Sequence, residues 1–222
     1  MKKELYFSSA TIAAASKEML ASVAVVRRRS GLPRFEPDRA ALLVLDMQAY
    51  FLGESSHAYI PSAAAIIPNL QALIRAFAAR GRPVIFTRHT NTPADAGRMA
   101  RWWNDLLAPD SPASAIIPEL DTTQGMVIEK RQYDAFYQTD LEQILRGRAV
   151  GQVVVTGVMT HLCCETTARS AFMSGFDVFF VIDGTATYTE AFHRASALNL
   201  AHGFAVPALA EEILAGFENE QS

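Results

Sequence analysis

Short runs of consecutive apolar residues recur along this sequence and alternate with longer amphipathic segments. Residues 40–47 (AALLVLDM) and 152–158 (QVVVTGV) are almost continuously apolar, as expected of strands that helices cover on both faces. Residues 62–80 instead place apolar side chains three and four positions apart, which is typical of a helix with one buried face. The alternation predicts a three-layer α/β/α fold with a doubly wound, mostly parallel, six-stranded sheet and right-handed crossovers.

The same patterns give the expected order of the remaining elements. Further strands are expected at residues 83–89, 126–130, 177–183 and 204–206, and further helices at 94–107, 140–145, 160–174, 189–202 and 211–217. The first forty residues differ, with a candidate helix at 9–26 and a connector at 31–37 that contains two prolines. We therefore expect an N-terminal helical arm (1–34) laid on one domain (35–222), a size that a single core commonly reaches.

Composition excludes several classes of function. The net charge of −3 and the short arginine triplet 27–29, which is typical of a solvated linker, give no basis for binding nucleic acid. Lys17 and Glu18 interrupt the apolar stretch near the N-terminus, so neither a secretory signal nor a membrane span is expected. The two cysteines, Cys163 and Cys164, are adjacent and unsuited to a mutual disulfide. A cytoplasmic protein acting on a small molecule is the resulting expectation.

Three reactive side chains stand where the predicted strands end. Asp46 closes the first strand, Lys130 closes the third, and Cys163 follows the fourth. Ligands bind parallel sheets beyond the carboxyl ends of the strands, so these residues are expected to converge there. A lysine favours a thiolate, and a carboxylate can accept and return the thiol proton. Each residue also has a structural alternative, since strand ends often carry capping aspartates and solvated lysines, and isolated cysteines often serve packing.

Helical spacing separates the two cysteines. If a helix begins near Thr160, Cys164 shares a stripe with Ala168 and Ala171, which is a pattern that faces a core. Cys163 lines up instead with more polar positions such as Thr167. Cys163 is therefore the predicted reactive thiol, and Cys164 is predicted to be structural.

Three segments resemble the isochorismatase-like hydrolase superfamily, in the order and spacing found there. They are FEPDRAALLVLDMQAYF (35–51), IEKRQYDAFYQTDL (128–141) and TGVMTHLCCETTARSAF (156–172). The resemblance implies that Asp46 is the general acid/base, Lys130 the cation that orients it and stabilises charge, and Cys163 the nucleophile. It also implies a non-proline cis peptide between Val158 and Met159, with the amides of Met159 and Cys163 forming an oxyanion hole.

The resemblance further implies the substrate-binding residues. Gln48 and His89 would contact the substrate, although isochorismatases usually carry a glutamine at the position of His89. Arg98 matches a family arginine that binds a substrate carboxylate. The neighbouring Trp102 and Trp103 are candidates for an apolar wall, for packing or for subunit contacts.

The nucleophile position determines the expected reaction. Isochorismatases proper commonly have glycine there, whereas this sequence has Cys163, which favours hydrolysis of a C–N bond in a small amide or imide through a thioester. The alternatives are isochorismate cleavage with Asp46 as general acid, and a catalytically inactive binding module, which the complete set of three residues disfavours.

The resemblance also bears on cofactors and assembly. The Asp-x-His metal motif of nicotinamidases is missing around His57, and no phosphate-binding loop is present, so we expect neither metal nor cofactor and disfavour nicotinamidase activity. A homodimer or homotetramer is expected, since superfamily members usually form one or the other.

Overall fold

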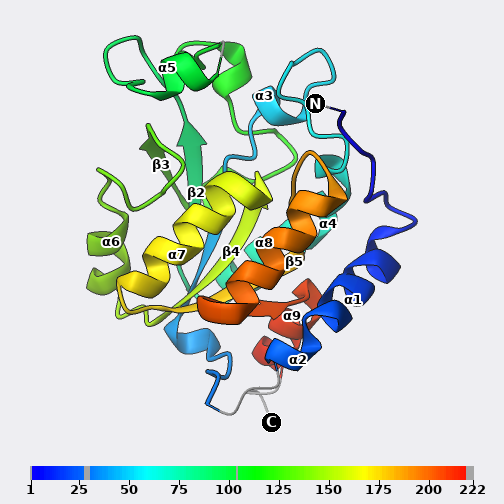
Figure 1. Cartoon of the computed structure of the whole chain (residues 1–222). Coiled ribbons are helices and arrows are strands. Elements are labelled where there is room, and N and C mark those ends of the chain that lie inside the picture. Colours follow the sequence, from blue (N-terminus) through cyan, green and yellow to red (C-terminus); the bar gives the residue numbers. More distant parts are fainter. Residues whose placement is uncertain (1, 28–30, 104, 219–222) are drawn as a thin grey trace.

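Six parallel strands form one sheet in the order β3-β2-β1-β4-β5-β6 in the computed structural model, which describes residues 2–27, 31–103 and 105–218 (Figure 1). The strands are β1 (Ala40–Leu45), β2 (Val84–His89), β3 (Met126–Lys130), β4 (Gln152–Val158), β5 (Asp177–Ala186) and β6 (Val206–Ala208). The chain order reverses between β1 and β4, which makes their carboxyl ends the switch point of a doubly wound sheet. The predicted fold class is confirmed, and the sheet is parallel throughout.

Helices cover both faces of this sheet. On one face, α4 (Ile67–Ala79) and α9 (Ala210–Glu218) pack on each other and on the strands. On the other, α7 (Glu165–Met173) and α8 (Glu190–Gly203) lie side by side in front of β4 and β5, and α6 (Leu141–Gly147) precedes β4 (Figure 1). Because both faces are covered, every residue of the central strands β1 and β4 is buried.

The N-terminal segment forms two helices where one was expected at 9–26. They are α1 (Ile12–Ser22) and the short α2 (Ala24–Arg27), separated at Val23. Ion pairs from Lys17 to Glu211 of α9 and from Glu18 to Arg194 of α8 place α1 between those two helices. The side chains of the arginine triplet 27–29 lie outside the described residues.

Three further expectations need correction. The helix expected at 94–107 is only α5 (Met99–Trp102), because Asp95 closes a turn on the Thr92 amide at 2.7 Å and Gly97 has a φ of +54°. The last strand begins at Val206 rather than at 204, because the amides of Phe204 and Ala205 still bond to the Leu200 carbonyl at the end of α8. β5 also continues to residue 186, past its predicted end at 183.

The shorter elements lie mostly in the connections. They are α3 (Ala49–Leu52), five further turns η1 (Pro37–Arg39), η2 (Ala63–Ile66), η3 (Pro112–Ser114), η4 (Thr122–Gln124) and η5 (Thr160–Cys164), the last of them a π-helical turn. None of the described helices has the length and apolar character needed to cross a bilayer.

A fully buried histidine makes the stability of the fold depend on pH. His193 of α8 lies 3.0 Å from the Tyr6 hydroxyl through Nδ1 and 3.2 Å from Thr185 Oγ1 through Nε2, and burial lowers its pKa to about 3. As the pH falls below 6.5, this histidine becomes protonated in the unfolded chain but stays neutral in the folded chain. Folding stability that is fully present above pH 6.5 is therefore lost progressively as the pH falls toward 3. We expect a loss of about 2–3 kcal/mol from this residue between pH 8 and pH 4.5.

Urea unfolding at the two pH values measures this effect. In His193→Gln the difference between pH 8 and pH 4.5 is expected to shrink by most of that amount, whatever the variant's stability at pH 8. His202→Gln, at an exposed position of the same helix, is the matched control and should keep the wild-type difference. An unchanged pH dependence in His193→Gln would show that other groups dominate.

Candidate active site

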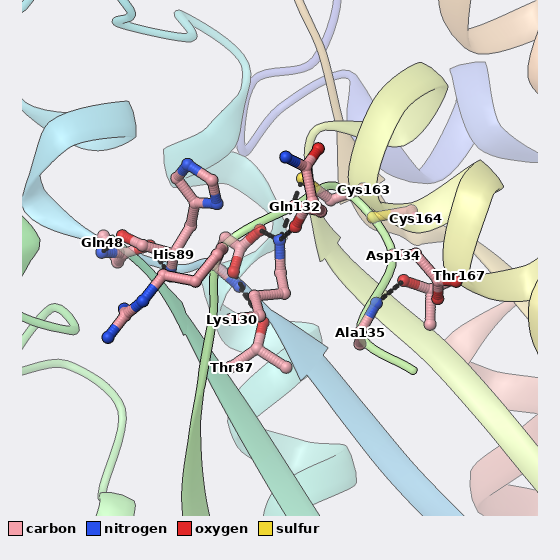
Figure 2. Close-up of polar contacts among 12 residues, drawn as sticks. Gln48, Thr87, His89, Lys130, Gln132, Asp134, Ala135, Cys163, Cys164 and Thr167 are labelled. Atoms are coloured by element: carbon pink, nitrogen blue, oxygen red, sulfur yellow. Dashed lines mark hydrogen bonds and ion pairs between the residues drawn. The ribbon is translucent and has the colours of Figure 1, made fainter. Parts of the chain in front are cut away.

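The ends of three strands bring a carboxylate, an ammonium and a thiol together. Asp46 directly follows β1, Lys130 is the last residue of β3, and Cys163 lies in η5 after β4. Lys130 Nζ is 2.7 Å from Asp46 Oδ2 and 3.4 Å from Cys163 Sγ, so the lysine bridges the acid and the thiol (Figure 2). The structure therefore brings all three predicted catalytic residues into one cluster.

Buried partners fix the positions of Asp46 and Lys130. Thr87 of β2 donates its hydroxyl proton to Asp46 Oδ1 at 2.6 Å and accepts the Asp46 amide proton at 3.1 Å. Lys130 Nζ also donates to the Gln132 carbonyl at 2.8 Å. Asp46 has a φ of +52°, a left-handed conformation that aspartate tolerates better than most residues and that is common at functional sites.

Electrostatics keep the lysine charged. Burial alone would lower the pKa of Lys130, but the Asp46 carboxylate and the Cys163 sulfur outweigh burial and leave that pKa raised. The side chains of Asp46 and Lys130 are both fully buried, so their charges interact with little screening by solvent. An ammonium is therefore present beside the sulfur before any substrate binds.

Cys163 is protonated in this resting arrangement. Burial raises the pKa of its thiol to about 12; Lys130 opposes that effect, and Asp46 adds to it through charge and hydrogen bonding. A base must consequently remove the proton as the sulfur attacks, and the Asp46 carboxylate is in place to do so. The cluster thus places a thiol beside a carboxylate and a fixed cation.

This balance predicts the behaviour of Asp46→Asn. Removal of the negative charge leaves Lys130 as the nearest ion, so the pKa of the Cys163 thiol should fall while turnover is lost. The pH dependence of Cys163 alkylation by iodoacetamide, followed by mass spectrometry, measures the shift. Asp105→Asn, a charge removal at the pocket rim, is the control. A thiol pKa that rises in Asp46→Asn would contradict the assigned charges.

The neighbouring cysteine belongs to the core. Cys164 is fully buried, its Sγ lies 3.8 Å from the Thr156 carbonyl, and it packs in the main hydrophobic cluster. Figure 2 shows its side chain apart from Cys163, toward the helix that carries Thr167. Cys163, in contrast, lines a pocket. The structure thus separates the two thiols as helical spacing predicts.

An aromatic pocket opens above Cys163. The empty space there, counted together with the open solvent at the mouth, is about 520 Å³. The lining residues are mostly aromatic or aliphatic: Tyr50, Phe51, Ala58, His89, Asn91, Met99, Trp103, Asp105, Leu106, Leu107, Tyr133, Met159, Cys163 and Tyr188. Trp103 Nε1 donates to the Tyr133 hydroxyl at 2.7 Å, which joins two parts of the wall. No lysine or arginine lines the pocket among the described residues.

Of the three predicted substrate-binding residues, only His89 lines the pocket. Burial lowers the pKa of His89 to about 4, so it is neutral near pH 7. The Gln48 side chain is instead bonded to backbone: it accepts from the His89 amide at 2.8 Å and donates to the carbonyls of His89 and Ser114. Arg98 is exposed at the start of α5 and does not line the pocket.

Other expectations concern the pocket wall and the oxyanion hole. Trp103 lines the pocket, whereas Trp102 is 78% exposed. The peptide bond between Val158 and Met159 is cis, as the family resemblance implies, and Met159 lies in the pocket wall beside the nucleophile. Sequence reasoning missed Tyr188 of the wall, whose position after β5 was the available signal.

The described residues contain no group of three or more His, Cys, Asp or Glu side chains placed to hold a metal ion. His57, around which the Asp-x-His motif is missing, lies beside two residues of the pocket wall. Its Nε2 is 3.2 Å from the Tyr50 hydroxyl and its Nδ1 is 3.5 Å from Asp105 Oδ2.

Comparison with known proteins agrees with this fold. The model of the isochorismatase domain matches residues 40–212. Nicotinamidase 3 of Arabidopsis thaliana is 43% identical over 171 residues, covering 75% of this chain and 82% of that protein. Enterobactin synthase component B of Escherichia coli K12 is 33% identical over 191 residues, covering 81% of this chain and 64% of that protein. The chain belongs to the isochorismatase family and is a hydrolase.

A solved structure supports the same assignment. The cysteine hydrolase from Pseudomonas syringae pv. phaseolicola 1448A superposes with a TM-score of 0.81 and is 28% identical, over 86% of this chain and 98% of that one. The family match begins at residue 40, so α1 and α2 lie outside it.

Proposed function

We propose that this hydrolase cleaves the C–N bond of a small, uncharged, planar amide through a thioester on Cys163. The observation that carries the proposal is the placement of Cys163 in an aromatic pocket that no described lysine or arginine lines. A flat, neutral ring suits such walls, because aromatic side chains bind ring faces and edges well. The similarity to a protein named as a nicotinamidase makes nicotinamide the first candidate substrate.

The mechanism follows from the positions of the charged groups. Asp46 accepts the thiol proton as Cys163 Sγ attacks the amide carbon, and the amides of Met159 and Cys163 donate to the resulting oxyanion. Asp46 then returns the proton to the nitrogen, the C–N bond breaks and ammonia leaves. Water, deprotonated by Asp46, hydrolyses the thioester and regenerates the thiol. Throughout this cycle Lys130, 2.7 Å from Asp46, offsets the negative charge that moves between acid and sulfur.

The pocket favours an amide over isochorismate. Isochorismate carries two carboxylates, whose burial requires cationic partners. Among the described residues, the wall carries the Asp105 carboxylate, which repels anions, and no lysine or arginine. The Lys3 ammonium lies at the mouth, on the Tyr188 ring, and Arg98 lies outside the pocket. Isochorismate cleavage, with Asp46 protonating the vinyl ether, stays the second candidate because of the 33% identity to enterobactin synthase component B.

Turnover assays on a matched substrate pair test the proposal. Nicotinamide is compared with the same ring bearing one added carboxylate, by following release of ammonia. We expect kcat/KM to be higher for the neutral amide by about 100-fold or more, which is the cost of burying one unpaired charge. Isochorismate is assayed beside them. Isochorismate cleavage at equal rates in the wild type and Cys163→Ala, with no release of ammonia, would overturn the amide assignment.

A further inference from the structure

Residues 3–6 lie against the mouth of the pocket. Lys3 Nζ stands over the Tyr188 ring, 4.5 Å from its centroid, and also donates to the His57 carbonyl. Tyr188 and Ala58 both belong to the pocket wall, and His57 directly precedes Ala58. One side chain from outside the matched family domain therefore contacts Tyr188 of the pocket wall and the residue that precedes Ala58.

Three hydrogen bonds attach residues 4 and 6 to the segment around Tyr188. The Glu4 amide donates to the Tyr188 carbonyl at 2.8 Å, and the Thr187 amide donates to the Tyr6 hydroxyl at 2.9 Å. The Glu190 amide donates to the Glu4 carboxylate at 3.0 Å. The residues on both sides of Tyr188 are thus bonded to residues 4 and 6.

A buried anchor fixes the other side of the segment. Ser62 Oγ accepts the amide protons of Tyr6 and Phe7 at 3.0 and 3.1 Å and donates to the Glu4 carbonyl at 3.2 Å. The Phe7 side chain is fully buried in the core cluster. Because Phe7 and Ser62 hold the backbone independently of Lys3, the Lys3 side chain can be replaced without removing the anchor.

We propose that Lys3 is a positioning residue that sets the width of the pocket by holding the Tyr188 wall and the His57 loop together. The ammonium binds the ring face of Tyr188 by a cation–π interaction and the His57 carbonyl by a charged hydrogen bond, so it joins two loops that share no strand. Without it, the mouth widens, and a small substrate loses contact with the Tyr188 side of the pocket. The kinetic part of this inference rests on the proposed amide hydrolysis.

Alkylation of Cys163 tests the pocket width without relying on any substrate. The ratio of rates for a bulky reagent, N-ethylmaleimide, and a small one, iodoacetamide, is measured with site assignment by mass spectrometry. We expect Lys3→Ala to raise this ratio about threefold to tenfold, the range set by one cation–π contact and one hydrogen bond. Lys3→Arg should restore the wild-type ratio, and Lys2→Ala, at an exposed position, should leave it unchanged.

Kinetics with nicotinamide supply the second readout. Lys3→Ala should raise KM about threefold to tenfold and change kcat less than about twofold, since the catalytic cluster is untouched. If the wild type hydrolyses no amide, the proposed function fails and the alkylation ratio alone decides the role of Lys3. An unchanged ratio in Lys3→Ala would overturn the inference, as would equal effects of Lys3→Ala and Lys2→Ala. A melting temperature close to that of the wild type shows that the anchor is intact.

Discussion

Cys163→Ala is expected to lower kcat for amide hydrolysis by about 10⁴-fold or more, because the nucleophile and the covalent route are lost together. Its side chain lines the pocket and lies 3.4 Å from the Lys130 ammonium. The variant should fold normally, since only one sulfur atom is removed at the end of the pocket. The residual rate reports what Asp46, Lys130 and the oxyanion hole contribute to direct attack by water.

The chain supplies a matched control at the next position. Cys164→Ala removes the same atom from the core, so it should cost about 1 kcal/mol of stability and change kcat less than about threefold. Ammonia release gives the rates, and trapping with hydroxylamine during turnover detects the thioester as a hydroxamate. Equal loss of activity in both variants would point to a packing role for the pair. Full activity in Cys163→Ala would remove the thioester from the mechanism.

The convergence of Asp46, Lys130 and Cys163 could be predicted because a parallel sheet imposes few choices. Side chains at the carboxyl ends of its strands share one edge, so an aspartate, a lysine and a cysteine found there in sequence converge in space. One detail lies beyond that rule. β2 separates β3 from β1, and Lys130 still contacts Asp46 because its long side chain reaches past Thr87. The contact therefore depends on the residue type at the end of the strand and on the length of the lysine side chain.

The substrate pocket could not be predicted in the same way, because loops form most of it. The segment expected as a helix at 94–107 is largely irregular, and its actual course places Trp103 in the wall and leaves Trp102 exposed. Gln48 matches a family motif, yet its amide is fully engaged with the backbone of two other segments. Motif matching identifies such a residue, but the direction of its side chain depends on contacts made by the loop around Ser114.

The tight packing of β1 against β4 connects fold stability to the site. Gly157 of β4 pairs with Leu45 of β1, has a φ of +100°, and leaves no room for a side chain. A Cβ atom there would lie 2.1 Å from the Leu45 carbonyl oxygen and 2.5 Å from its nitrogen. Both are backbone atoms that cannot rotate away. Since Asp46 follows Leu45 directly and Met159 follows Gly157 by two residues, any adjustment of the two strands also moves Asp46 and Met159.

Gly157→Ala should therefore destabilise the protein by at least about 3 kcal/mol, from the left-handed backbone and the steric overlap together, and lower the melting temperature by about 6–12 °C. Urea unfolding and thermal melts measure the effect. Gly147→Ala is the matched control, because that glycine ends α6 with open space around its Cβ position. Alanine there should be neutral or slightly stabilising. If Gly157→Ala stays within about 1 kcal/mol of the wild type, β1 and β4 can separate without cost, and the close approach does not position Asp46.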